Sequence, residues 1–164
     1  MAENYKETKA FLRKYGDSVE QEIEKRLTNN GKIASGKLYD SIRYEVKETK
    51  SEFIISFLMA DYGDYVDKGV QGSESGKAGK GGKSKYKYRN LMPPETREFR
   101  SWLKLKGIPK EKSYVIRRSI WKFGITPTNF FTIPTTRRQK YFDEQVAIAM
   151  AKDIDKQIQD GINK

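Results

Sequence analysis

The stretch Ile42-Arg-Tyr-Glu-Val-Lys-Glu-Thr-Lys-Ser-Glu-Phe-Ile-Ile-Ser-Phe-Leu-Met59 decides the fold class of this chain. Its first part alternates apolar and charged residues. After a polar turn at 48–51 the second part alternates again, and this pattern is typical of half-buried strands. The alternating apolar positions are Ile42, Tyr44, Val46, Phe53, Ile55, Phe57 and Met59. We therefore expect an antiparallel hairpin over residues 42–59.

The second strand of this hairpin is the more apolar of the two. Because Ile54 and Leu58 add a second apolar face, we expect this strand to lie more centrally in its sheet. Its inner face carries Phe53, Ile55 and Phe57. We expect the helices to cover that face, with Trp102 and Ile120 packed over it.

Long amphipathic helices are predicted on both sides of the hairpin. Apolar residues recur at helical spacing from about Tyr5 to Asn29 and from about Thr136 to Ile162. The first set is Tyr5, Leu12, Tyr15, Val19, Ile23 and Leu27, and the second is Phe142, Val146, Met150, Ile154 and Ile158. Gly16 is a point where the first helix could kink or divide, and Asn30-Gly31 provides its C-terminal stop.

Shorter elements are predicted around the hairpin and before the last helix. A connector at 33–42 has room for a helical turn. A short helix is expected at 61–69, with Asp61 as its N-cap and Gly69 as its terminator. Pro93-Pro94 opens a helix that continues through Leu105 and stops at Gly107. A further helix covers 110–123 and ends at Gly124, and the segment from Ile125 to Pro134 is expected to be extended. The expected buried set of the 110–123 helix is Val115, Ile116, Ile120 and Phe123.

These patterns predict a single α+β domain over residues 1–164. A small antiparallel β-sheet packs against long amphipathic helices. The domain also carries a flexible basic Gly/Lys loop at 71–90 and a C-terminal helix at 136–162.

Composition narrows the function classes. The chain has 164 residues, a formal net charge of +11, and neither cysteine nor histidine. These absences exclude disulfides, thiol nucleophiles and the commonest zinc ligands. We expect no enzymatic activity, no cofactor and no metal.

No stretch approaches the ~18 apolar residues of a membrane span, and the N-terminus lacks an apolar secretion core. We therefore expect synthesis in a reducing cytoplasm and no membrane partner.

The positive charge is concentrated in the middle of the chain. Residues 71–122 carry fifteen Lys or Arg and only four Asp or Glu. Such a segment is suited to nucleic acid, an acidic protein surface or anionic lipid, and equally to a solvated face. Within 71–90, basic and aromatic residues interleave, as phosphate contact and base stacking require. A loop that orders only against a neighbouring subunit is the alternative. The candidate contact residues are Lys77, Lys80, Lys83, Lys85, Lys87 and Arg89.

Two further patterns resemble a phosphate-binding loop and a cation site, but neither indicates a functional site. Gly82-Lys83-Ser84 ends like a phosphate-binding loop, but Lys77 stands where that motif needs a glycine. Asp61, Asp64 and Asp67 are spaced three apart, as ligands of a hard cation would be on one helical face. An acidic, solvated helix start gives the same spacing and is the interpretation we adopt.

Three motifs, taken in order, resemble the neck and tail-completion proteins that join head to tail in tailed bacteriophages. Ser35-Gly-Lys-Leu-Tyr-Asp-Ser-Ile42 is similar to the family's Thr/Ser-Gly-x-Leu-x-x-Ser-Ile, and Tyr62-Gly-Asp-Tyr-Val-Asp-Lys-Gly69 to its Tyr-Ala-x-Tyr-Val-Glu-x-Gly. The third runs from Trp102-Leu-Lys-Leu-Lys-Gly-Ile108 through Ile116-Arg-Arg-Ser-Ile120 and Gly124 to Asn129-Phe-Phe131. The resemblance spans about residues 33–131, and Gly63 and Asp67 depart from the family's usual Ala and Glu.

The resemblance implies a non-enzymatic virion protein that forms a ring at the head–tail junction, as a neck or tail-completion (terminator) subunit around the DNA channel. Its partners would be copies of itself, other neck, portal-side or tail proteins, and the genomic DNA. The alternative is a basic nucleic-acid-binding domain that uses residues 71–122. The motif residues carried over as assembly positions are Gly36, Leu38, Ser41, Ile42, Tyr62, Tyr65, Val66, Gly69, Trp102, Phe130 and Phe131.

Overall fold

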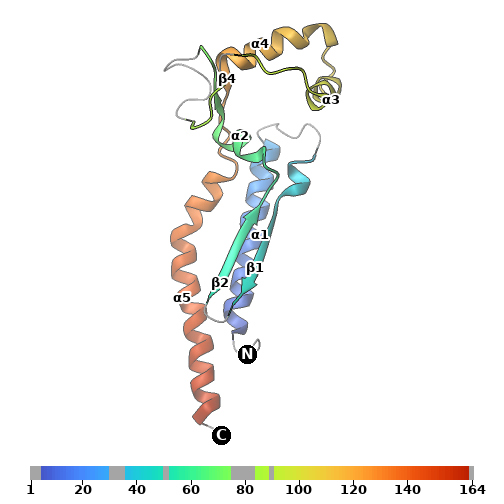
Figure 1. Cartoon of the computed structure of the whole chain (residues 1–164). Helices are drawn as coiled ribbons and strands as arrows, with labels where there is room; N and C mark the ends of the chain where they lie inside the picture. Colours follow the sequence, from blue (N-terminus) through green and yellow to red (C-terminus); the bar gives the residue numbers. More distant parts are fainter. Residues whose placement is uncertain (1–4, 30–35, 50–51, 75–83, 89–90, 163–164) are drawn as a thin grey trace.

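The computed structural model describes residues 5–29, 36–49, 52–74, 84–88 and 91–162. The chain is elongated and has two parts (Figure 1). The part we call the body contains helix α1 (Lys6–Asn29), strands β1 (Arg43–Glu48) and β2 (Phe53–Leu58), and helix α5 (Thr132–Ile162). The part we call the head contains strands β3 (Val70–Gln71) and β4 (Gly124–Ile125) and helices α3 (Arg97–Leu105) and α4 (Ser113–Phe123). Helix α2 (Gly63–Lys68) lies between them. The predicted α+β class is confirmed.

Helix α1 forms as its apolar spacing predicts. Its buried apolar side chains are Leu12, Tyr15, Val19, Ile23 and Leu27. Gly16 neither kinks nor divides the helix, which runs unbroken to Asn29. A Cβ at Gly16 would lie 2.4 Å from the Tyr44 ring of β1. The glycine therefore lets the hairpin approach the helix closely, and the Tyr44 hydroxyl donates to Asp17 Oδ1 at 2.7 Å.

The hairpin is antiparallel, as predicted, and Tyr44 pairs with Phe57 and Val46 with Ile55. Two details of the prediction are wrong. Among the described residues this sheet has only β1 and β2, so β2 is not central, and Ile54 is exposed. Ile55 and Phe57 do pack on the core, but Trp102 and Ile120 do not belong to that cluster, because α3 and α4 lie in the head (Figure 1).

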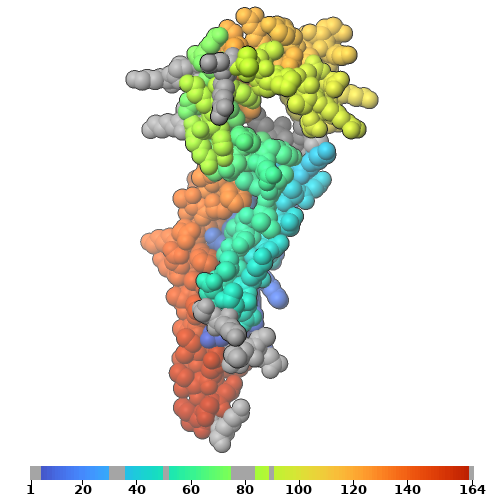
Figure 2. Space-filling view, in the orientation of Figure 1, coloured from blue at the N-terminus to red at the C-terminus, as the bar shows by residue number. Residues whose placement is uncertain are grey.

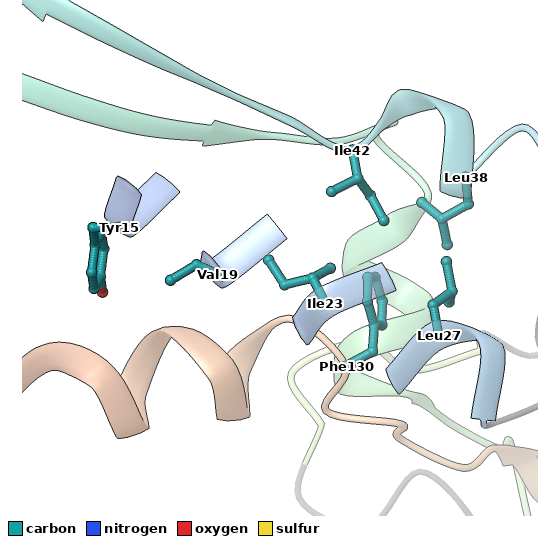
Figure 3. Packing of buried hydrophobic residues seen from close by; sticks show 7 residues of the cluster. All are labelled: Tyr15, Val19, Ile23, Leu27, Leu38, Ile42 and Phe130. Carbon is teal, nitrogen blue, oxygen red and sulfur yellow. The ribbon is translucent and has the colours of Figure 1, made fainter. Parts of the chain in front are cut away.

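The core of the body surrounds α1. Seven buried residues from three separate segments meet in it, as Figure 3 shows: Tyr15, Val19, Ile23, Leu27, Leu38, Ile42 and Phe130. Phe130 is fully buried although it precedes α5. The short connector before β1 contributes Leu38 and Ile42, and between them a 3₁₀ turn forms at Tyr39–Ser41. The helical turn expected in this connector is therefore present.

Helix α5 runs alongside α1 for much of its length (Figure 1). It begins at Thr132, four residues earlier than the sequence pattern predicted, so the segment to Pro134 is not wholly extended. Pro134 lies in the first turn, where a missing N–H costs no helical hydrogen bond. Of the predicted apolar set, Phe142 packs against the core, whereas Met150, Ile154 and Ile158 are exposed.

The head is held together by the β3–β4 pair, which joins Val70 to Ile125 and Gln71 to Gly124. Helix α3 begins at Arg97, after the Thr96 hydroxyl accepts from Phe99 N–H at 3.2 Å. The start predicted at Pro93-Pro94 is thus too early. A 3₁₀ turn at Lys110–Lys112 precedes α4. Within the described part of the chain, no helix has the length and apolar character that membrane crossing requires.

The predicted buried set of α4 is wrong for two of its four members. Val115 is 66% exposed and Phe123 49% exposed, whereas Ile116 and Ile120 are half-buried, and in this helix only Ser113 is fully buried. The Ser113 hydroxyl donates to Glu95 Oε2 at 2.5 Å, which connects α4 to the segment before α3. The apolar spacing correctly predicts a helix, but Val115 and Phe123 are exposed to solvent.

Candidate functional site

The region where body and head meet is built around α2, and it contains most of the motif residues. Gly63, the second residue of the Tyr62–Gly69 motif, is buried beneath the hairpin end of the body. A Cβ there would lie 2.6 Å from Met59 Sδ and 3.0 Å from Leu38 Cδ1. Glycine therefore lets α2 lie directly on the body. Asp61 is not the N-cap of this helix, because Tyr62 holds that position without a side-chain hydrogen bond.

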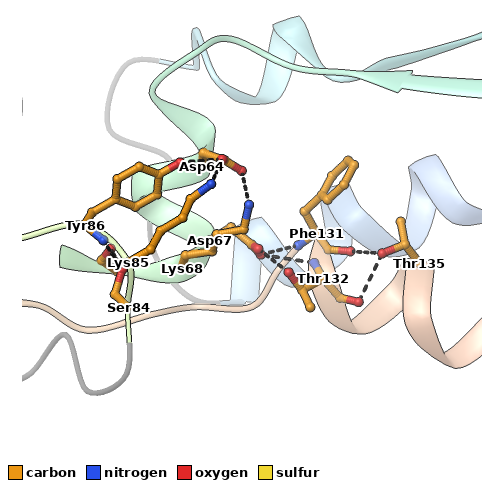
Figure 4. Close-up of polar contacts among 10 residues, drawn as sticks. Asp64, Asp67, Lys68, Ser84, Lys85, Tyr86, Phe131, Thr132 and Thr135 are labelled. Carbon is orange, nitrogen blue, oxygen red and sulfur yellow. Dashed lines mark hydrogen bonds and ion pairs between the residues drawn. The ribbon is translucent and has the colours of Figure 1, made fainter.

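Asp67 joins α2 to the start of α5. Its side chain is fully buried, and Oδ1 accepts hydrogen bonds from Phe131 N–H at 2.8 Å and Thr132 N–H at 3.1 Å (Figure 4). The Thr132 hydroxyl donates to Oδ2. A carboxylate at this position satisfies N–H groups that have no partner within the helix, and it complements the helix dipole. The solvated position predicted for Asp67 is therefore wrong.

Backbone contacts reinforce the same connection. The carbonyl oxygen of Asp67 accepts from Asn129 N–H at 2.9 Å, and the Thr128 hydroxyl donates to the Val66 carbonyl at 2.8 Å. Asn129 adopts a positive φ of 50°, which asparagine tolerates better than most residues. The chain thus turns sharply beside α2 and sends Phe130 into the core.

Asp64, three residues before Asp67 in α2, holds the segment 84–88 in place. It accepts from Lys68 Nζ at 2.8 Å and from the Tyr86 hydroxyl at 2.6 Å (Figure 4). The Lys68 hydrogen bond is the main reason that the pKa of Asp64 lies below its ordinary value, followed by the Tyr86 bond. Tyr86 also packs on Tyr65, with ring centroids 4.4 Å apart.

Two described parts of the predicted 71–90 loop, 71–74 and 84–88, are hydrogen-bonded to each other, and the first also bonds to α4. Gln71 N–H donates to the Tyr86 carbonyl at 2.8 Å, and Tyr88 N–H donates to the Gln71 carbonyl at 2.9 Å. Lys85 and Lys87 are exposed on this ordered segment, and Lys85 Nζ lies 4.0 Å from Asp64 Oδ2. The other predicted basic contacts lie outside the described residues: Lys77, Lys80, Lys83 and Arg89.

The first motif is tied to the body by Ser41. Its hydroxyl donates to the Leu38 carbonyl at 2.7 Å and accepts from Ala60 N–H at 2.9 Å. The serine thereby links the 3₁₀ turn to the chain that leaves β2. Gly36 has a φ of +74° and opens this turn, with Asp40 N–H donating to its carbonyl.

Gly69 is one of the tightly constrained glycines of the motifs. Its φ is +71°, and a Cβ would lie 2.5 Å from the Ile125 carbonyl oxygen and 2.7 Å from Pro127 N. Both are backbone atoms of the strand and loop that lead back to the body, so they have little freedom to move. Gly69 thus ends α2, as predicted, and also allows β3 and β4 to come together.

A cleft of about 830 Å³ opens between the two parts. The end of α1 contributes Leu27, the motif residues Leu38, Tyr62 and Val66 form one wall, and α3 forms the other. Trp102 and Leu105 are its apolar residues on α3, beside Thr96, Arg97, Glu98 and Ser101. The cleft brings a residue of each of the three motifs together, although Trp102 and Tyr62 are 40 positions apart in the sequence.

The described residues contain no group of three His, Cys, Asp or Glu that could hold a metal ion. Asp64 and Asp67, two of the three spaced aspartates, instead bond to two different segments of the chain. Sequence reasoning missed the roles of Asp67 and Tyr86, and nothing local in the sequence indicates either contact. No family model, curated protein or solved structure matches this chain.

Proposed function

We propose that this chain is a structural subunit of a tailed bacteriophage, part of a ring at the head–tail junction through which the DNA passes. One observation carries the proposal. Residues of all three motifs that resemble the neck and tail-completion family, dispersed over 35–131 in the sequence, come together where body and head meet, although the Ile116–Ile120 segment lies on α4 in the head. Leu38, Ile42 and Phe130 share the core, with Val66 and Phe131 packed against it.

The way these residues meet supports a shared architecture. Here Ser41, Asp67 and Gly69 each have a specific bonding or steric role at the junction of body and head. The residues that depart from the family pattern also fit, because Gly63 packs under Met59 and Asp67 bonds directly to the start of α5.

The shape of the chain favours a subunit of a larger assembly. Exposed large apolar residues cluster on α4 and on the C-terminal half of α5, and such clusters on a soluble chain mark surfaces that meet a partner.

The test is the composition of the particle. Virions purified from the phage that carries this sequence should contain the chain in a few tens of copies at most, as quantitative mass spectrometry would measure. Antibody labelling in negative-stain images should mark the head–tail junction. If the chain is absent from purified virions, or if the label marks the capsid surface or tail tip, the proposal fails.

A basic nucleic-acid-binding domain is the second candidate, favoured by the charge of the head. The described head residues, 69–74, 84–88 and 91–125, carry eleven Lys or Arg and four Asp or Glu, a net charge of +7. A salt titration of binding to duplex and single-stranded DNA separates the two functions. A true binder keeps tight affinity with a steep salt slope, whereas attraction that disappears near physiological salt is generic.

A further inference from the structure

The C-terminal half of α5 presents an apolar face that nothing in the described chain covers. Ile154 is 47% exposed and Ile158 55% exposed. The other members of the face recur at helical spacing beside them: Ile148, Met150 and Ile162. The opposite side of the helix is the one that contacts α1, where Ala149 and Asp153 are buried. We call these five exposed residues the α5 face.

Acidic residues border the α5 face. Asp155 follows Ile154 directly, and Glu144 is four residues before Ile148, which brings both to the same edge of the helix. Both side chains are exposed. Without Asp153, which is buried against α1, residues 143–162 carry four Asp or Glu against two Lys, a net charge of −2. The face is therefore suited to an apolar partner surface bordered by positive charge.

Helix α4 presents a surface of the complementary kind. Tyr114, Val115 and Phe123 are exposed on α4, and the exposed Arg118 lies one turn after Tyr114 and Val115. Lys112 is exposed one residue before α4 begins. The helix itself, Ser113–Phe123, contains three basic residues and no acidic one. We call Lys112, Tyr114, Val115, Arg118 and Phe123 the α4 face.

The two faces of one chain cannot meet each other. Helix α4 lies in the head, and the C-terminal half of α5 extends beyond the hairpin at the opposite end of the molecule (Figures 1 and 2). Two α5 faces would bring acidic borders together, and two α4 faces would bring basic borders together. Like charges that face each other across an interface disfavour the contact. Only the α5 face of one copy against the α4 face of another joins apolar surfaces with opposite charges.

We infer that the α5 face of each subunit docks on the α4 face of a neighbouring copy. This inference rests on the proposed ring function and names the contact that builds the ring. The contact is heterologous, because different surfaces of the two copies meet. Such contacts propagate around a ring when the rotation between subunits closes, and into filaments when it does not.

A charge-exchange experiment tests the contact. One variant, Glu144→Lys with Asp155→Lys, makes the border of the α5 face basic. A second, Lys112→Glu with Arg118→Glu, makes the border of the α4 face acidic. Each variant alone places like charges at every contact. When the two variants are mixed in equal amounts, opposite charges are restored at every contact. The changed α5 face of one variant meets the changed α4 face of the other, and the unchanged faces meet each other.

The readout is self-association measured by sedimentation velocity over a protein concentration series. We expect association of the wild-type chain, a loss of at least about tenfold in affinity for each variant alone, and recovery close to the wild-type value in the equal mixture. Recovery also shows that neither variant is misfolded. A control variant, Lys14→Glu with Lys25→Glu on exposed positions of α1, makes the same charge change as the second variant and should associate as the wild type does.

Three results would overturn the inference: wild-type chain that stays monomeric throughout the series, variants that associate as well as the wild type, or an equal mixture that does not recover. In each case the chain could still be found in virions, and the proposed function would stand. If instead the chain is absent from virions but the charge-exchange experiment gives the expected results, the proposed function is rejected and the docking of the two faces stands.

Discussion

The Asp153 carboxylate of α5 lies at the N-terminus of α1, where Oδ2 accepts hydrogen bonds from Thr8 N–H at 2.8 Å and from the Thr8 hydroxyl at 2.7 Å. Oδ1 accepts from Glu7 N–H at 3.0 Å. Both Thr8 and Asp153 are buried. The long helix that ends the chain thus caps the helix that begins it, just as Asp67 caps α5 itself. Each long helix has its first turn fixed by an aspartate from a different element.

Replacing Asp153 should therefore destabilise the body strongly. In Asp153→Ala the N–H groups of Glu7 and Thr8 and the Thr8 hydroxyl lose their acceptor, which should cost about 2–4 kcal/mol of unfolding free energy. Asp155→Ala, on the exposed side of the same helix, removes an equal charge and should change stability by less than about 0.5 kcal/mol. Urea denaturation followed by circular dichroism measures both. Equal effects would show that the capping contact contributes nothing.

The same contact should make stability depend on pH. Burial alone would raise the pKa of Asp153, but the hydrogen bonds from Thr8 and Glu7 outweigh it, and the pKa lies below its ordinary value of 3.8. A carboxyl with a lowered folded-state pKa stabilises the fold above its unfolded pKa, and this stabilisation is lost as the pH falls. The unfolding free energy of the wild type should exceed that of Asp153→Asn by its full amount at neutral pH, and this difference should shrink below about pH 4. A constant advantage down to pH 2 would contradict this assignment.

The elements that the sequence predicts well are those whose pattern is local. The spacing of Leu12, Val19 and Ile23 specifies α1, and the alternation of Val46, Ile55 and Phe57 specifies the hairpin. An apolar period of 3.6 or 2 residues indicates a helix or a strand. In α1 and in the hairpin, the face on which the apolar residues recur is also the face that packs inward.

Two kinds of feature could not be predicted this way. The apolar face of α4 gives the same pattern as a buried one, because spacing tells which residues share a face and not what covers it; Val115 is the clearest case. Contacts such as Asp67 with Thr132, 65 positions apart, depend on how the elements pack. A short acidic helix and a Thr after Phe130-Phe131 carry no local signal for such a bond.

Gly69 should tolerate no side chain. Gly69→Ala combines a φ of +71° with a Cβ placed 2.5 Å from the Ile125 carbonyl oxygen, and it should cost at least about 2–3 kcal/mol. Gly107→Ala is the matched control, because Gly107 also has a positive φ, +63°, but its Cβ would meet nothing within 4 Å. That variant should lose only the conformational part, about 1 kcal/mol. Thermal unfolding of both variants separates strain from collision, and similar losses would argue against a close approach of β3 and β4.

Phe130 should carry more of the stability of the body than any aromatic residue of the hairpin. It is fully buried among Ile23, Leu27 and Leu38, so Phe130→Ala leaves a cavity in the centre of the core and should cost about 3–5 kcal/mol. Phe57 is only partly buried, and Phe57→Ala should cost clearly less. Phe123→Ala, at an exposed position of α4, should leave the unfolding free energy of the monomer nearly unchanged. Chemical denaturation of the three variants gives the ranking, and a Phe57 loss equal to that of Phe130 would mean that the hairpin, and not the start of α5, completes the core around α1.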